Sequence, residues 1–259
     1  MPKVAIISDI HANLPAFKAV LKEIQASGAN QIAVLGDIVG YGASPAECVE
    51  LCCKLAASAV AGNHDVDMQK YRNGHLPLER NWQKDGFLAG LVHAAVSLNP
   101  RQAEWLAALP YAKLIKGAVI AHGSLHDPKA FYYIDSDCSA APTLKLLASQ
   151  EHKIGFFGHT HEQGIFHHPK TKLIWESETT FTIPADQPCA ITVGSVGQPR
   201  SEYERRAGWV LWDPETRRVE LRKTEYNRLQ AAQDIVKAGL PAESALRLMS
   251  DKEYAFLIQ

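Results

Sequence analysis

Five short clusters of polar side chains carry the residue types that bind metal ions in proteins. They are Asp9-x-His11, Gly36-Asp37, Gly62-Asn63-His64-Asp65, His122-Gly123 and Gly158-His159-Thr160-His161. Carboxylate, amide and imidazole donors together suit Mn2+, Fe or Zn2+ better than Ca2+. One ion takes about four to six donors, and this set offers more, which indicates two ions that share a carboxylate. Two such ions, about 3.5–4 Å apart, form a clamp for in-line displacement at phosphorus.

Each cluster taken alone has a simpler explanation. Asp9-x-His11 could cap a helix, Gly36-Asp37 is common turn chemistry, and the cluster at residues 62–65 could be a loop with an Asx-turn. A single histidine such as His122 is more often a hydrogen-bonded core residue. The joint occurrence is the specific feature, because every cluster directly follows an apolar run. We therefore favour the metal site over the simpler explanations.

The apolar runs before these clusters predict the elements that position them. Residues 3–9, 31–37 and 58–63 have the composition of buried strands, and helical patterns at residues 13–28 and 44–57 separate them. This alternation predicts a parallel sheet with crossover helices. Ligands of such sheets bind outside the carboxyl ends of the strands, which is where the polar clusters lie.

The second half of the chain changes character. Residues 82–109 are predicted to be helical with a break at residues 98–102, and strands follow. Strands are expected within the segments 112–124, 152–168, 171–177, 188–197 and 208–224. We predict an α/β (α+β) fold: a four-layer αββα sandwich of two mixed β-sheets flanked by helices. Residues 1–223 would form this domain, and residues 224–259 a short C-terminal helical extension packed on it.

Composition excludes several kinds of partner. The 259 residues are 46% hydrophobic and 21% charged, with a formal net charge of −1 and a pI of about 6.8. Such a balance gives no electrostatic footprint for bulk nucleic acid or a membrane surface, but it allows a small anionic substrate. The N-terminus has no leader pattern, which predicts a cytoplasmic protein. We expect a monomer or a small homo-oligomer. Of the five cysteines, Cys48, Cys52 and Cys53 fit thiols on a helix better than a metal site.

In their order along the chain, the five clusters resemble the calcineurin-like metallophosphoesterase superfamily. The resemblance covers roughly residues 1–223. The stretches ISDIHANLPA, GDIVGYG and GSVGQPR are similar to those of its small bacterial and archaeal phosphodiesterase-like, diadenosine tetraphosphatase-related members. Thr192-Val193 depart from the residues expected before GSVGQPR, which affects no metal ligand.

The resemblance implies a role for each site residue. Asp9, His11 and His161 would hold one divalent ion, Asn63, His122 and His159 the other, and Asp37 would bridge them. The ions would be Mn2+, Fe2+/Fe3+ or Zn2+. His64 would be an uncoordinated acid beside the phosphoryl group, and Asp65 would hydrogen-bond and orient its ring. Hydroxide formed from a water between the ions would attack phosphorus.

The implied activity is hydrolysis of phosphomono- or phosphodiester bonds in small, nucleotide-type substrates. Arg200 could donate to a substrate phosphate or be a surface arginine, His126 could line the pocket or be an exposed loop histidine, and Tyr41 could face the substrate or pack. The segment 124–150 is expected to be a lid or substrate wall, whose aromatic residues 131–133 stack on a base or anchor the loop.

Two alternatives remain, a protein phosphatase and a non-catalytic scaffold on the same fold. Scaffold relatives typically lose the acid histidine or some ligands, and this chain keeps His64 and all seven ligand positions. The chain also lacks a second domain for a protein substrate, so its size favours small molecules.

Overall fold

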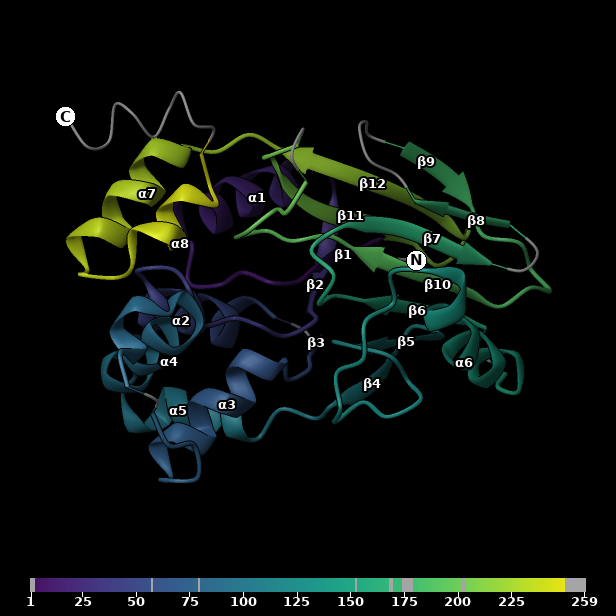
Figure 1. The fold of residues 1–259 in the computed structure, drawn as a ribbon. Helices are drawn as coiled ribbons and strands as arrows, with labels where there is room; N and C mark the ends of the chain where they lie inside the picture. The colour runs from purple at the N-terminus through teal and green to yellow at the C-terminus, as the bar shows by residue number, and fades with distance from the viewer. Residues whose placement is uncertain are drawn as a thin grey trace.

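Two six-stranded sheets packed face to face make up the centre of the molecule (Figure 1). A computed structural model of the chain describes residues 3–56, 58–78, 80–151, 153–167, 170–173, 179–201 and 204–249. The first sheet has the strand order β3-β2-β1-β11-β12-β9 and the second the order β4-β5-β6-β10-β7-β8. Both sheets are mixed. Neighbouring strands pair in parallel within β3-β2-β1 and within β5-β6-β10, and the other pairs are antiparallel.

The strand bounds follow the apolar runs of the sequence. The first sheet contains β1 (Lys3–Ile7), β2 (Ala29–Val34), β3 (Ser58–Ala59), β9 (Thr179–Thr182), β11 (Ala207–Asp213) and β12 (Arg218–Thr224). The second contains β4 (Ala112–Ile115), β5 (Ala118–Ala121), β6 (Ile154–Phe157), β7 (Gln163–His167), β8 (Lys170–Leu173) and β10 (Cys189–Val193).

Alternating side chains of the strands separate the core into layers. In β1, Val4 and Ile6 face the second sheet, whereas Ala5 and Ile7 face the helices on the other side. Between the sheets, Phe156 packs against Trp212 with ring centroids 5.1 Å apart. Helices α1 (Leu14–Ala26), α2 (Pro45–Leu55) and α4 (Gly86–Ser97) cover the first sheet, and α6 (Asp137–Ala148) covers the second. The predicted four-layer sandwich is therefore confirmed.

Two helices were not expected from the sequence. Helix α3 (Asn63–Arg72) replaces the predicted loop after β3, and its apolar pattern is weak because only His64, Asp65 and Met68 are buried. Helix α6 lies inside the predicted lid, where Pro142 in its interior favours a break. The helical segment at 82–109 divides as predicted into α4 and α5 (Pro100–Ala107), preceded by a 3-10 turn, η1 (Trp82–Lys84).

The last helices of the described residues are α7 (Arg228–Lys237) and α8 (Ala242–Leu246), which lie beside α1 and α4 (Figure 1). They bury Ile235, Leu248 and neighbouring alanines against Ala89 and Trp82. Residues 250–259 lie outside the described residues, and the division of the chain after residue 223 stays a prediction. Cys48 and Cys52 are buried on α2, as expected. None of the described helices is both long and apolar enough to cross a bilayer.

Candidate functional site

The five polar clusters converge where parallel strands of both sheets end. Asp9 and His11 follow β1, Asp37 follows β2, and the remaining clusters follow β3, β5 and β6. Backbone hydrogen bonds join neighbouring strand ends, with Asp9 N donating to Gly36 O at 3.1 Å and His11 N to Asp37 O at 2.9 Å. Between the sheets, the backbone N–H of His159 donates to Oδ2 of Asp9 at 3.0 Å. The predicted convergence is thus built from the sheet edges themselves.

The backbone is strained at these strand ends. Left-handed φ angles occur at Asp9 (54°), His11 (46°), Asp37 (50°), His159 (70°) and His161 (62°). Residues other than glycine rarely adopt this backbone conformation, and each residue held in it costs about 1–3 kcal/mol of folding free energy. Strain of this kind concentrates at functional sites, where the surrounding structure holds it in place. Here it turns successive polar side chains of one chain segment toward a common point.

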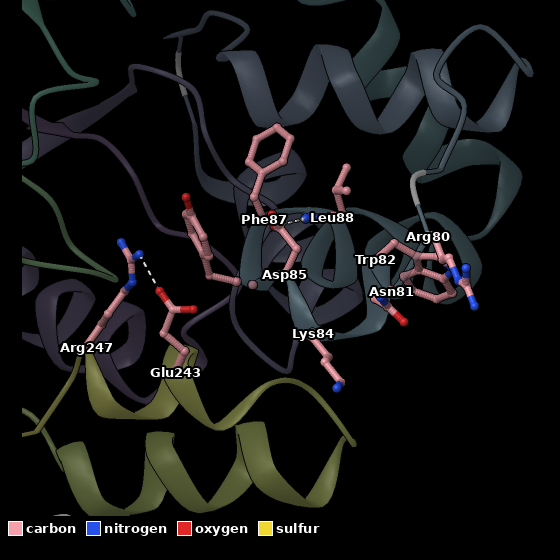
Figure 2. A pocket seen from close by; sticks show the side chains of 11 residues that line it. Arg80, Asn81, Trp82, Lys84, Asp85, Phe87, Leu88, Glu243 and Arg247 are labelled. Carbon is pink, nitrogen blue, oxygen red and sulfur yellow. Dashed lines mark hydrogen bonds and ion pairs between the residues drawn. The ribbon is translucent and has the colours of Figure 1, made fainter.

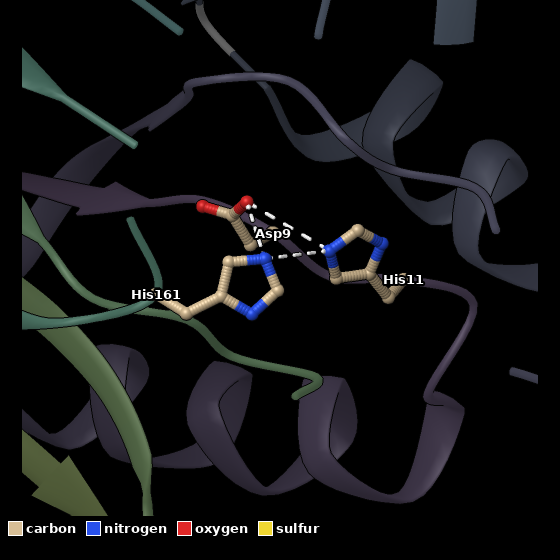
Figure 3. Close-up of side chains that lie close together, drawn as sticks. All are labelled: Asp9, His11 and His161. Carbon is tan, nitrogen blue, oxygen red and sulfur yellow. Dashed lines mark hydrogen bonds and ion pairs between the residues drawn. The ribbon is translucent and has the colours of Figure 1, made fainter. Parts of the chain in front are cut away.

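Asp9, His11 and His161 form the first group of donors (Figure 3). Nε2 of His161 lies 3.2 Å from Oδ1 of Asp9, and Nε2 of His11 lies 3.7 Å from the same oxygen. The other ring nitrogens are held by backbone carbonyls, with Nδ1 of His11 3.2 Å from Val39 O and Nδ1 of His161 2.6 Å from Gln198 O. A carbonyl only accepts, so Nδ1 of each ring carries a proton, and Nε2 is the nitrogen left to face the carboxylate.

The two Nε2 atoms also face each other. The Nε2 atoms of His11 and His161 are 3.1 Å apart. Burial, followed by the neighbouring imidazoles of His64 and His161, keeps the pKa of His11 well below its usual value, so its ring is neutral. Oδ1 of Asp9 is buried and, within the described part of the chain, receives no hydrogen bond. Two imidazole nitrogens and a carboxylate oxygen this close together suit a shared cation, and these residues therefore fit a metal ion.

A second group is formed by Asp37, His122 and His159, with Asn63 beside them. Nε2 of His122 lies 3.2 Å from Oδ2 of Asp37 and 3.2 Å from Oδ1 of Asn63. Its Nδ1 donates to Leu35 O at 2.7 Å, which fixes this ring in the same way as His11 and His161. The group therefore offers oxygen and imidazole donors suited to a second ion.

Asp37 lies between the two groups. Its Oδ1 accepts the backbone N–H of His64 at 2.8 Å, whereas Oδ2 is 3.8 Å from Nε2 of His11 and 3.2 Å from Nε2 of His122. A side chain at Gly62 would overlap Asp37, so only glycine allows this close approach. One carboxylate oxygen facing both groups fits the bridging role that the resemblance implies for Asp37.

The electrostatics of the cluster fit cations. Burial opposes the charged form of Asp37, but the imidazoles of His122, His64 and His11 together keep its pKa well below the usual value. Burial also disfavours charge on His122, yet the carboxylates of Asp37 and Asp9 outweigh it and raise its pKa to about 9. Without a metal, a proton on His122 thus supplies positive charge that a bound ion would replace.

His64 differs from His11, His122 and His161 in how it is held. It is buried with its Nε2 4.0 Å from Oδ2 of Asp37, and its ring packs against Tyr41 and Phe87 with centroids 4.6 Å apart in both pairs. No described group hydrogen-bonds its Nδ1. The prediction that Asp65 hydrogen-bonds the His64 ring is wrong. Its carboxylate instead accepts hydrogen bonds from the backbone N–H groups of Ile38, Val39 and Gly62. Asp65 thus ties the Asp37 loop to the start of α3.

The whole-chain comparisons agree with this geometry. The family model described as calcineurin-like phosphoesterase matches residues 2–227. The chain belongs to the calcineurin-like phosphoesterase family. It is 33% identical over 245 residues to the uncharacterized protein MJ0912 of Methanocaldococcus jannaschii, covering 92% of this chain and 93% of that one.

Two further family relatives extend the comparison. The crystal structure of a metallophosphoesterase from Sphaerobacter thermophilus has a TM-score of 0.82 and 30% identity, covering 95% of this chain and 98% of that chain. Phosphodiesterase YfcE of Escherichia coli K12 is 32% identical over 94 residues, or 32% of this chain and 50% of that one. As a calcineurin-like phosphoesterase, this chain therefore combines the family fold with a cluster of His and Asp side chains able to hold metal.

The three predicted substrate contacts lie outside the two donor groups. Tyr41 packs against the rings of both His11 and His64 and lines a pocket of about 460 Å3. Phe87 and Arg247 line the same pocket (Figure 2). Burial raises the pKa of Tyr41 while the charges of Arg200 and Arg247 oppose the shift, so Arg200 is an exposed cation close enough to act on that phenol. His126 is exposed and lines a separate pocket together with Tyr133.

Sequence reasoning missed several residues that shape this site. Phe87 contacts His64 from α4. The carbonyls of Leu35, Val39 and Gln198 fix the histidine rings of the two donor groups. Backbone acceptors carry no sequence signal. Phe87 comes from α4, whose packing against His64 cannot be inferred from spacing alone.

Proposed function

We propose that this chain is a metal-dependent phosphoesterase that hydrolyses small phosphorylated molecules, nucleotides among them. Two divalent ions, Mn2+, Fe or Zn2+, would be held by Asp9, His11 and His161 and by Asn63, His122 and His159, with Asp37 shared. The observation that carries the proposal is the common orientation of three imidazoles. The Nδ1 atoms of His11, His122 and His161 are held by carbonyls, so all three Nε2 atoms face the carboxylates.

When bound, such ions lower the pKa of a coordinated water and neutralise charge on a phosphate. The protein residues supply the orientation and a proton. His64 would donate a proton from Nε2 to the leaving oxygen, because that nitrogen faces the cluster while Nδ1 faces the tightly packed Gly40. Burial lowers the pKa of His64 to about 4, so the ring is neutral until a negatively charged phosphate beside it favours the charged form.

Tyr41, Arg200 and His126 would contact the substrate beyond the phosphoryl group. Tyr41 is in contact with His64, so it lies on the side where a leaving group departs. Arg200 supplies an exposed guanidinium near Tyr41, with geometry suited to a phosphate or carboxylate. His126 would contact the more distant part of a larger substrate.

The test is a substrate panel with protein loaded with Mn2+, and in parallel with Zn2+ or Fe2+. The panel contains p-nitrophenyl phosphate, bis-p-nitrophenyl phosphate, cyclic nucleotides, dinucleoside polyphosphates and a phosphoserine peptide. We expect turnover of small phosphate esters that depends on the metal. No turnover of any compound by protein with two bound ions would refute the proposal and favour the scaffold alternative. A strong preference for the phosphopeptide would favour a protein phosphatase.

A further inference from the structure

A pocket beside the second donor group contains two lysines that the proposed chemistry does not use. It has a volume of about 480 Å3, and its lining includes Asn63, His159, Lys70 and Lys129. Lys70 belongs to α3 and Lys129 to the loop after β5, so the two cations reach the pocket from separate elements. The pocket therefore joins two proposed metal ligands to a wall that carries two cations and one carboxylate, Asp67.

The charges of this wall are available to an anionic ligand. Nζ of Lys70 is 2.8 Å from Oδ1 of Asp67, and the Lys70 side chain is 52% exposed. Exposed ion pairs of this kind contribute little, about 0–1 kcal/mol, and exchange readily with a stronger anion. Nζ of Lys129 lies 5.5 Å from the centroid of the Tyr111 ring, which holds it at the pocket without neutralising it.

Aromatic side chains of the segment after β5 complete the pocket. Phe131 is buried and packs against Tyr111 and His122, so it anchors the loop. Tyr132 and Tyr133, in contrast, are 55% and 44% exposed. Tyr133 lies flat on the ring of His159, with centroids 3.9 Å apart and an interplanar angle of 12°. Two neighbouring exposed tyrosines beside a metal ligand offer a surface for a planar ring.

The same two tyrosines also line a second pocket. This pocket has a volume of about 450 Å3 and includes Ser124, His126, Asp135 and Ser139. His126 and Tyr132 lie with ring centroids 6.4 Å apart on its wall. The two pockets thus share Tyr132 and Tyr133 as a common wall. The pocket with Lys70 and Lys129 adjoins the proposed metal ligands, and the pocket with His126 is lined by aromatic rings, hydroxyl groups and a carboxylate.

We propose that this face binds a nucleotide with two or more phosphates, an inference that rests on the proposed function. The scissile phosphate lies at the donor groups, the next phosphate lies over Lys70 and Lys129, and the base packs against Tyr132 in the pocket that contains His126. Charge-assisted contacts to lysine and stacking on an aromatic ring are the interactions that recognise these two parts of a nucleotide.

The pocket on the His64 side is the competing location (Figure 2). It also contains cations, Arg80, Lys84 and Arg247, but Arg247 pairs with Glu243 at 2.7 Å. None of the seven proposed ligands lines it, and Tyr41 and Phe87 separate it from His64. The pocket with Lys70 and Lys129 is favoured because Asn63 and His159 belong to its wall.

Binding is measured by calorimetry on Mn2+-loaded protein carrying His64→Asn, which slows turnover, and on metal-free wild type. The ligands are inorganic tripolyphosphate and the non-hydrolysable analogue adenosine 5′-(β,γ-imido)triphosphate. Lys70→Ala and Lys129→Ala should each weaken both ligands by roughly 3- to 10-fold, the range for loss of one charged contact. Tyr132→Ala should weaken the adenine compound by roughly 5-fold or more and leave tripolyphosphate unchanged.

Lys237→Ala on α7 is the matched control, because it removes the same charge from an exposed position away from both pockets. Lys70→Ala leaves Asp67 unpaired, so the double variant Asp67→Asn/Lys70→Ala separates loss of the lysine from gain of a negative charge. The proposal is overturned if the two lysine variants match Lys237→Ala, if Lys84→Ala causes the loss instead, or if Tyr132→Ala weakens both ligands equally. Hydrolysis of bis-p-nitrophenyl phosphate by wild type tests the proposed function independently of these outcomes.

Discussion

Metal binding to this site should release a proton from one particular ligand, His122. Its pKa of about 9 in the metal-free protein means that the ring is charged at neutral pH. Coordination needs the neutral ring, so the proton on Nε2 must leave before a metal can take its place beside Asp37. The pKa of His159 is lowered to about 4, chiefly by burial, so that second ligand of the same group is already neutral.

The size of the effect follows from these pKa values. At pH 7, two units below a pKa of about 9, roughly 1% of His122 is neutral, which weakens metal binding about 100-fold, or ~2.7 kcal/mol. Affinity for the second ion should therefore rise roughly tenfold per pH unit between pH 7 and 8.5. Conversely, His122 stabilises the metal-free fold below about pH 6.5, and this stabilisation is lost as pH rises toward 9.

The assay is titration calorimetry with Mn2+ at pH 8, repeated in two buffers of different ionisation enthalpy. Burial, with a further contribution from Asp37, raises the pKa of Asp65 to about 7, so at pH 8 this neighbour is already charged and does not contribute. We expect Mn2+ binding to release about one proton per chain in wild type and none in His122→Gln. The His159→Gln variant should still release the proton when it binds metal, because His122 is intact. Binding that is independent of buffer and flat between pH 7 and 8.5 would refute the reasoning.

Three further predictions concern His64 and the C-terminal helices. His64→Asn should lower kcat by about 10²- to 10⁴-fold with two ions still bound by elemental analysis; loss of the metal instead would make His64 a ligand. Gly40→Ala should lower kcat because its Cβ would overlap Nδ1 of His64, whereas Gly28→Ala, also at positive φ but in open space, should change only stability. Deleting residues 225–259 should lower Tm by roughly 4–8 °C, for a loss of ~2 kcal/mol, and leave two ions bound; an unfolded product would show that these residues are not an extension.

The convergence of the ligands was predictable because strand ends have a fixed geometry. Apolar runs locate β1 and β2 of the first sheet and β5 and β6 of the second, and parallel strands bring their carboxyl ends to one edge of each sheet. Asp9 therefore lies near Asp37, and His122 near His159. Helix α3 was not predictable in the same way. Its start depends on Asp65 accepting the N–H of Gly62, and its polar sequence gives almost no apolar periodicity.

The roles of individual side chains depended on packing that a sequence does not specify. Asp65 follows His64 directly, and this spacing suggests a contact between them. In α3, however, consecutive side chains point in different directions, and Asp65 instead meets the N–H groups of Ile38 and Val39. Likewise, the sequence does not show which of Phe131, Tyr132 and Tyr133 is buried. In the structure only Phe131 is buried and anchors the loop. Exposure, which decides between a core and a binding role, is a property of the folded chain.

The central claim is that this cluster of side chains holds two divalent ions around Asp37. It is tested most directly by an anomalous difference map from crystals grown with Mn2+. We predict two peaks in each molecule, one bounded by Asp9, His11 and His161 and the other by Asn63, His122 and His159, with the carboxylate of Asp37 between them. A single peak, a peak coordinated by Nε2 of His64, or no peak at saturating Mn2+ would contradict the account.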